Sequence, residues 1–256
     1  MVSGELMNVN VAGLSRRLRD RLSPKSPVYI FHHIPKCGGT SLNQVLEEWF
    51  TVVRDYRMGF TGDYPAKTEL SRLRSAHCLC GHFEAEGQLL HQRYPEVWEG
   101  DRYRVFSFIR DPLELQLSLF RYAELHNPKP KRTLEKHLAR RPNYVASVLS
   151  ATPENYKEVL DRYFFIGILE QGQESLDVLA QALGKPAKQL PWSNQTRSPK
   201  ARKKLPLTRR KITKFREENA LDYLIYDYCL ERFEAQKQEV QLLEEVGLLR
   251  PEDGPD

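Results

Sequence analysis

The stretch "FHHIPKCGGTS" (31–41) places a lysine, two glycines and two hydroxyl side chains close together. Glycines let the backbone approach an anion, hydroxyls donate hydrogen bonds to it, and a lysine adds a point charge. Lys36 precedes Gly38 and Gly39, whereas a Walker A loop places its lysine after the second glycine and directly before Ser or Thr. This order predicts anion binding and does not indicate a hydroxyl-bound Mg²⁺.

The elements on either side of this loop favour the same chemistry. "VYIFHHI" (28–34) is an apolar, aromatic-rich run between two prolines, which is typical of a buried parallel strand. After the loop, apolar residues recur at helical spacing, which predicts a helix. The free N–H groups and the dipole at the start of that helix favour an anion. An ordinary glycine-rich turn is the alternative interpretation. The helical apolar residues are Leu42, Val45, Leu46, Trp49 and Phe50.

Three more apolar runs predict strands, and helical patterns separate them. The runs are 76–83, 103–109 and 163–169, and "ESLDVLAQALG" follows the last as a helix that Gly184 is placed to cap. Alternating strands and helices predict a single α/β domain with a central parallel sheet flanked by helices. A long helical region, one helix or two, is expected over about 212–248. We expect an N-terminal extension (1–27), the domain (28–250) and a C-terminal tail (251–256).

A second motif, "FSFIRDPLELQLSLFRY" (106–122), also follows a predicted strand. Arg110 ends the strand, Asp-Pro begins a helix, and Ser118 follows on that helix. A guanidinium at a strand end is suited to clamp a phosphate. Taken alone, Arg110 and Asp111 are also compatible with a surface ion pair.

These two motifs resemble those of sulfotransferases that use 3′-phosphoadenosine 5′-phosphosulfate (PAPS). "PKCGGTS" resembles the family's phosphosulfate loop, Pro-Lys-x-Gly/Ala-Gly/Ser-Thr-Ser/Thr, and the second motif resembles its 3′-phosphate site. The resemblance implies a P-loop-like phosphosulfate-binding loop, with Arg110 and Ser118 at the 3′-phosphate and adenosine 3′,5′-bisphosphate as the product. The loop residues implied are Lys36, Cys37, Gly38, Gly39, Thr40 and Ser41.

Two further stretches resemble the family less specifically. "FIGILEQGQESLDVLAQALG" (165–184) is similar to its Gly-x-x-Glu strand and following helix. "RSPKARKKLPLT" (197–208) is similar to a basic loop that closes over the cofactor, especially in uronyl 2-O-sulfotransferases, and implies Lys204 as a contact. The resemblance spans roughly residues 28–235 and is nearest in motif style to that carbohydrate branch.

The resemblance implies transfer of a sulfuryl group from PAPS to a hydroxyl of a carbohydrate or another small molecule. Lys36 is placed to neutralise charge on the leaving phosphate. Histidine suits the role of general base near neutral pH. His82 resembles the second histidine of a His-x-His motif in 2-O-sulfotransferases, whose first position is Cys80 here. Glu84 and Glu86 are alternative bases.

Other interpretations remain open. A nucleotide-dependent small-molecule kinase would use the same kind of loop, although the Gly-Lys-Ser/Thr order is missing. A non-catalytic nucleotide- or glycan-binding protein would share the motifs without turnover. "HCLCGH" (77–82) suggests zinc, but its spacing is Cys-x-Cys, and His77 would point away from the face that Cys78 and Cys80 share, so we expect no metal.

Composition limits the remaining classes. The chain has 256 residues and a formal net charge of +5, which favours anionic ligands in general. No apolar run reaches about 18 residues, so no membrane span is expected. The basic stretch 197–214 holds few aromatic residues, which disfavours nucleic acid. The whole chain has four cysteines, of which Cys78 and Cys80 flank a single residue. They do not form a disulfide framework, so we expect a cytoplasmic protein. No feature indicates an oligomeric state.

Overall fold

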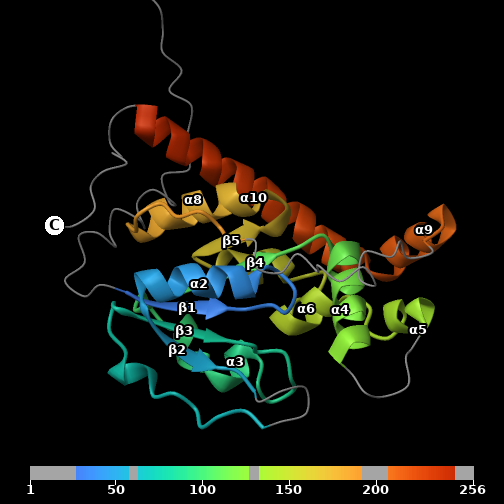
Figure 1. Cartoon of the computed structure of the whole chain (residues 1–256), viewed down its shortest axis with the longest axis horizontal. Helices are drawn as coiled ribbons and strands as arrows, with labels where there is room; N and C mark the ends of the chain where they lie inside the picture. Colours follow the sequence, from blue (N-terminus) through green and yellow to red (C-terminus); the bar gives the residue numbers. More distant parts are fainter. Residues whose placement is uncertain (1–26, 58–62, 127–132, 192–206, 246–256) are drawn as a thin grey trace, which may run out of the picture.

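The computed structural model describes residues 27–57, 63–126, 133–191 and 207–245 (Figure 1). Five parallel strands form one sheet in the order β2-β3-β1-β4-β5. This confirms the predicted α/β fold with a central parallel sheet. The predicted strands at 28–34, 76–83 and 163–169 are slightly shorter in the structure, and the strand at 103–109 has the predicted bounds. The strands are β1 (Val28–His32), β2 (Thr51–Asp55), β3 (His77–Gly81), β4 (Tyr103–Ile109) and β5 (Phe165–Ile168).

Strand β2 was not predicted from the sequence, and the structure corrects this omission. Helix α2 (Gly39–Trp49) ends one residue before the strand, so only Phe50 lies between the two elements. No glycine, proline or asparagine marks the change. As an edge strand, β2 buries only its last residue, Asp55, and its side chains do not form the apolar run that marks the inner strands.

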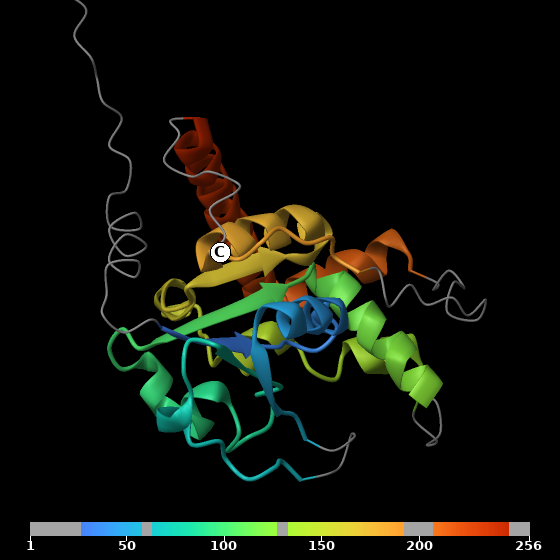
Figure 2. The same cartoon turned by 60° about the vertical axis from the view of Figure 1, so that its left-hand side comes forward.

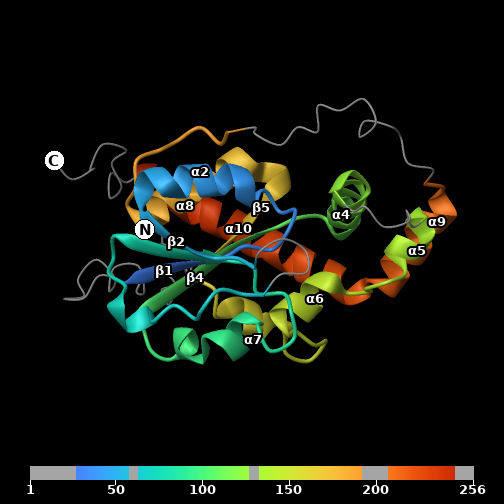
Figure 3. The same ribbon diagram turned by 60° about the horizontal axis from the view of Figure 1, so that its bottom comes forward.

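Helices cover both faces of the sheet (Figures 1 and 3). Helices α2 and α8 (Gly172–Leu183) lie on one face, and the short helices α3 (Leu90–Arg93), α6 (Tyr144–Leu149) and α7 (Tyr156–Asp161) lie on the other. Helix α2 buries Leu42, Val45, Leu46 and Trp49, as its predicted spacing requires. Gly184 caps α8 with a φ of 63°, which confirms the predicted cap.

The predicted C-terminal helical region is two helices. Helix α9 (Arg209–Glu218) ends at Asn219, and α10 (Ala220–Glu245) packs on β5, α6 and α8. Helices α4 (Pro112–His126), α5 (Leu134–Leu138) and α9 gather beyond the carboxyl ends of the strands (Figure 1). Apolar residues of α4 and α5, together with Leu207 just before α9, form a small cluster separate from the main core: Leu117, Phe120 and Leu134, with Leu113, Leu138 and Leu207 packed against them.

Neighbouring strands β1 and β4 have connections that leave in opposite directions. The chain leaving β1 leads through α2 to β2 on one side, whereas the chain leaving β4 leads through α4 toward β5 on the other (Figure 2). In open α/β sheets, ligands bind at the carboxyl ends of the strands at such a reversal. A ligand site is therefore expected at the loops that follow β1 and β4. None of the described helices combines the length and apolar character that crossing a bilayer requires.

Candidate functional site

The loop that follows β1 has an unusual backbone, which sets the direction of Lys36. Lys36 has a φ of 67° and Gly38 a φ of 81°, both in the left-handed region. Such a φ is strained for a side-chain-bearing residue such as lysine and costs glycine nothing. Gly38 is the N-cap of α2, so the loop delivers the chain directly to the helix N-terminus. Backbone N–H groups without intrahelical partners are expected there.

Close packing explains both glycines of the loop. A Cβ atom on Gly39 would lie 1.8 Å from Nε2 of His33, and one on Gly38 would lie 2.6 Å from Cδ1 of Leu169. Cys37 beside them is buried, and burial raises the pKa of its thiol. The side chain at position 37 is therefore a neutral thiol, and its backbone N–H donates a 3.3 Å hydrogen bond to the Ile34 carbonyl. Thr40 is exposed and Ser41 is half-buried in the first turn of α2.

Arg110 directly follows β4, the strand next to β1. Burial lowers the pKa of the Lys36 ammonium, and the positive charge of Arg110 lowers it further. Lys36 and Arg110 are thus close enough for their positive charges to repel each other. Arg110 pairs loosely with two carboxylates, at 3.4 Å from Glu114 and 3.9 Å from Glu170. An anion between Lys36 and Arg110 would relieve this repulsion.

Helix α4 carries the rest of the predicted 3′-phosphate motif. The Asp111 carboxylate accepts backbone hydrogen bonds from Leu113 (2.9 Å) and Glu114 (3.0 Å), and so caps the helix. Ser118 is half-buried on α4, one turn before Tyr122 and on the same face. The ammonium of Lys36 lies 4.4 Å from the centre of the Tyr122 ring. The face of α4 that holds Ser118 therefore looks toward the loop.

His82 follows β3 and lies in an aromatic cluster. Its ring centre is 4.3 Å from that of His33 and 4.7 Å from that of Tyr56. Burial lowers the pKa of His82 to about 4, so the ring is neutral at neutral pH. Within the described part of the chain, its Nε2 atom is buried and has no hydrogen-bond partner. Because buried polar atoms are nearly always paired, this atom is suited to meet a ligand.

The same cluster connects His82 to the loop. Nδ1 of His33 lies 3.1 Å from the Tyr56 hydroxyl, which also accepts a 3.0 Å hydrogen bond from Asn43 of α2. Of two adjacent histidines at the carboxyl end of β1, His32 and His33, one reaches the site. His33 does so, since it contacts both Gly39 and His82. His32 is buried among core residues, with Nδ1 2.8 Å from the Tyr163 hydroxyl.

The two alternative bases have different surroundings. Glu84 accepts a 3.0 Å hydrogen bond from Arg57 on one oxygen and a 2.7 Å hydrogen bond from the Tyr144 hydroxyl on the other. Both oxygens are thus occupied, and its side chain is only 12% exposed. Glu86 is exposed and accepts a hydrogen bond from Gln92. Neither carboxylate has the unpaired, buried acceptor that His82 has.

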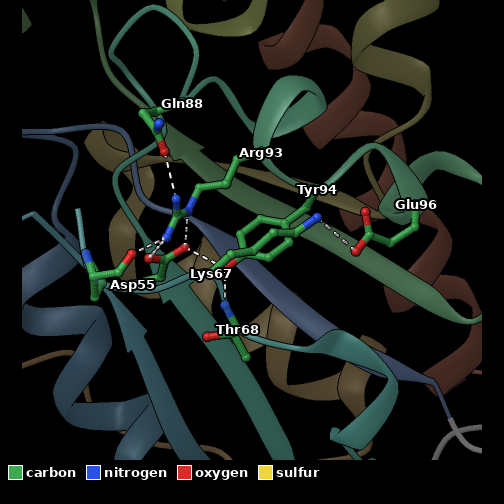
Figure 4. Close-up of polar contacts among 8 residues, drawn as sticks. Asp55, Lys67, Thr68, Gln88, Arg93, Tyr94 and Glu96 are labelled. Atoms are coloured by element: carbon green, nitrogen blue, oxygen red, sulfur yellow. Dashed lines mark hydrogen bonds and ion pairs between the residues drawn. The ribbon is translucent and has the colours of Figure 1, made fainter.

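A buried ion pair fixes the end of β2 next to this cluster (Figure 4). Asp55 is fully buried and accepts hydrogen bonds of 2.7 and 2.8 Å from Nε and Nη2 of Arg93, and one of 2.7 Å from the Tyr94 hydroxyl. Arg93 also donates to Gln88 and to the Pro65 carbonyl. The hydrogen bond to Asp55 raises the pKa of the Arg93 guanidinium. This network ties α3 and the Pro65 segment to β2.

The zinc interpretation finds no support in the described residues. Cys78 and Cys80 are buried within the sheet with their Sγ atoms 3.7 Å apart. Nδ1 of His77 accepts a hydrogen bond from the backbone of Arg74. Across the described ranges, no group of three or more His, Cys, Asp or Glu side chains is arranged to hold a metal. Lys204, the contact implied for the basic loop, lies outside the described residues.

Three partners of this site were not foreseen from the sequence. Tyr56 and Arg57 follow the unpredicted strand β2, and Tyr144 begins α6. Recognising β2 would have placed Tyr56 and Arg57 at the carboxyl edge of the sheet. No sequence signal connects Tyr144 with Glu84.

Comparison with known proteins gives similarities among solved structures only. No family model and no curated protein sequence matches the chain. A sulfotransferase from Alicyclobacillus acidocaldarius is similar with 16% identity and a TM-score of 0.44, over 78% of this chain and 96% of that one. Mouse sulfotransferase SULT7A1, solved in complex with PAP, is similar with 15% identity and a TM-score of 0.48, over 79% and 89%. Similarity at this level carries no argument about what the chain binds or catalyses.

Proposed function

We propose that this protein is a sulfotransferase that moves a sulfuryl group from PAPS to a hydroxyl of a carbohydrate or another small molecule. One observation carries the proposal: Lys36 and Arg110 follow the adjacent strands β1 and β4 and oppose each other's charge. Two cations at this reversal of the sheet suit a ligand with two separate anionic groups. The quoted sequence motifs around Lys36 and Arg110 point to the same ligand.

The residues present fit the two anionic ends of PAPS. The loop amides, the start of α2 and Lys36 would hold the phosphosulfate, and Arg110 with Ser118 would hold the 3′-phosphate. When bound, PAPS supplies the activated sulfuryl group. Lys36 neutralises the negative charge that develops on the leaving phosphate. The described residues hold no metal site, and Lys36 supplies a positive charge at the leaving group.

We assign the general base to His82. A general base must be unprotonated before it accepts a proton, and the His82 imidazole is unprotonated at neutral pH because burial lowers its pKa to about 4. Its buried Nε2 has no partner among the described residues, so it is available to a hydroxyl. Glu84 is a weaker candidate, since Arg57 and Tyr144 occupy both its oxygens. Its carboxylate instead favours the imidazolium that forms on His82.

A binding experiment tests the cofactor. Titration calorimetry with adenosine 3′,5′-bisphosphate and with AMP should show tighter binding of the bisphosphate. One charge-assisted hydrogen bond is worth about 1.5–3 kcal/mol, or about 10–150-fold in affinity. Arg110→Ala should abolish this preference. Arg72→Ala, which removes an exposed cation on the 3₁₀ helix η1 (Leu70–Arg72), should leave it unchanged.

Two outcomes would contradict the proposal. If ATP with Mg²⁺ binds more tightly than the bisphosphate, the kinase interpretation replaces it. If the bisphosphate binds but PAPS is not consumed with any of a panel of carbohydrate and small-molecule hydroxyl acceptors, the protein binds nucleotides without transferring sulfuryl groups. With an active acceptor, His82→Gln should abolish turnover and Glu86→Gln should not.

A further inference from the structure

We propose that Tyr122 is a positioning residue that holds the ammonium of Lys36 at the site before the anion arrives. This inference rests on the proposed function for its kinetic part only. The ammonium lies 4.4 Å from the centre of the Tyr122 ring, within the range of a cation–π contact. Tyr122 belongs to α4, the helix that begins just after Arg110. One helix therefore connects both cations of the site.

The surroundings of Lys36 explain why the lysine needs such a partner. Its backbone is held in the left-handed region, its side chain is half-buried, and Arg110 opposes its charge. Arg110 has carboxylates nearby in Glu114 and Glu170. Among the described residues, no carboxylate lies within ion-pair distance of Lys36. The negative face of the Tyr122 ring is the partner that the structure gives its ammonium.

An aromatic ring suits this role better than a carboxylate would. A carboxylate would repel the incoming anion and would compete with it for the ammonium. A ring carries no net charge, and its attraction for the ammonium is weak enough to be replaced by a phosphate oxygen. The ring of Tyr122 is 37% exposed and stacks on His126, with the ring centres 4.2 Å apart. The lysine is thus kept near its working position and is released when the anion binds.

Two substitutions at position 122 separate this role from a structural one. Tyr122→Leu removes the aromatic face, and Tyr122→Phe keeps it. Leu125→Ala is the matched control, because Leu125 lies on the same helix and is 47% exposed. Far-ultraviolet circular dichroism and thermal melting of all three variants establish that they are folded.

The first measurement does not depend on activity. In the NMR spectrum of the full chain, the ε-methylene protons of Lys36, assigned with Lys36→Arg, should be shifted upfield by the Tyr122 ring. The shift should persist in Tyr122→Phe and disappear in Tyr122→Leu. Saturation with adenosine 3′,5′-bisphosphate should remove it in the wild type. If no upfield shift is present, or if calorimetry shows that the bisphosphate binds and the shift is unchanged, the inference is wrong whatever the protein catalyses.

The second measurement is kinetic and uses an acceptor that the wild type sulfates. Tyr122→Leu should raise the KM for PAPS by about 3–10-fold and leave kcat within about twofold, because the contact holds the lysine only until the anion binds. Tyr122→Phe should recover most of the wild-type KM, and Leu125→Ala should match the wild type. An unchanged KM in Tyr122→Leu overturns the inference. If the wild type itself transfers no sulfuryl group, the proposed function fails and the NMR result alone decides the role of Tyr122.

Discussion

The buried ion pair between Asp55 and Arg93 should make the β2 edge of the sheet sensitive to the loss of either partner alone. Arg93→Met removes the guanidinium that donates two hydrogen bonds to Asp55. Asp55 is fully buried and, among its hydrogen-bond donors in the described part of the chain, would keep the Tyr94 hydroxyl. A buried carboxylate that loses its cation keeps its desolvation cost and loses the attraction that offset it.

The expected loss is large. Breaking a buried pair by removing one partner costs about 3–5 kcal/mol. Domains are stable by only about 5–15 kcal/mol, so this is a substantial part of the whole. For a domain of this size, 1 kcal/mol corresponds to about 2–4 °C in Tm, which gives a decrease of about 6–20 °C. The Pro65 carbonyl and Gln88 side chain lose a donor as well, which adds to the effect.

Urea unfolding followed by circular dichroism measures this loss. The matched control is Arg72→Met, because Arg72 also pairs with a carboxylate, Glu69, but is 81% exposed. An exposed pair of this kind contributes about 0–1 kcal/mol. The double variant Asp55→Asn/Arg93→Met should lose less than the sum of the two single variants, because no unpaired charge remains buried.

Equal stability of Arg93→Met and Arg72→Met would refute this reasoning. It would mean that the Asp55 carboxylate is protonated or solvated once Arg93 is gone, and that the network does not hold the end of β2. The result also bears on the site, since Tyr56 directly follows Asp55 and contacts both His33 and His82.

Three further predictions concern the site. Gly39→Ala should weaken binding of adenosine 3′,5′-bisphosphate in calorimetry. The new Cβ, built at its ideal position, would lie 1.8 Å from Nε2 of His33 and would therefore displace that ring. Lys36→Ala should lower kcat by about 10²–10³-fold, as for other groups that stabilise developing charge, and change the affinity for the bisphosphate far less; equal losses in both would contradict its role at the leaving group. Stability measured in urea should fall as the pH drops from about 6.5 toward 4, because buried His82 has a pKa of about 4 and the unfolded chain binds more protons in that window; His82→Gln should reduce this slope.

Local patterns predicted the elements that form the centre of this fold. Apolar runs between turn residues marked β1, β3, β4 and β5, and helical spacing marked the buried face of α2. The rule that parallel strands end at one edge then brought the residues after β1, β3 and β4 to the same side of the sheet. Lys36, His82 and Arg110 lie there for that reason. Their roles in binding and catalysis stay predictions.

What the sequence did not predict depends on contacts between distant residues. Strand β2 follows α2 without a turn residue, and its single buried side chain is a charged one, Asp55. The break between α9 and α10 falls at Asn219, which has no glycine or proline beside it. There, Asn219 accepts a hydrogen bond from the backbone of Asn143, and the Asn143 side chain in turn accepts from Leu221 at the start of α10. Hydrogen bonds of this kind between distant residues produce no periodic pattern in the sequence.

The order of lysine and glycines in the loop has a structural consequence. A lysine after the glycines would stand on the first turn of α2. Lys36 stands before them, and its left-handed backbone turns its side chain toward α4, where it meets Tyr122 and opposes the charge of Arg110. The glycines meanwhile lie against Leu169 and His33. The lysine is therefore placed between the loop and α4, the helix that follows the neighbouring strand β4.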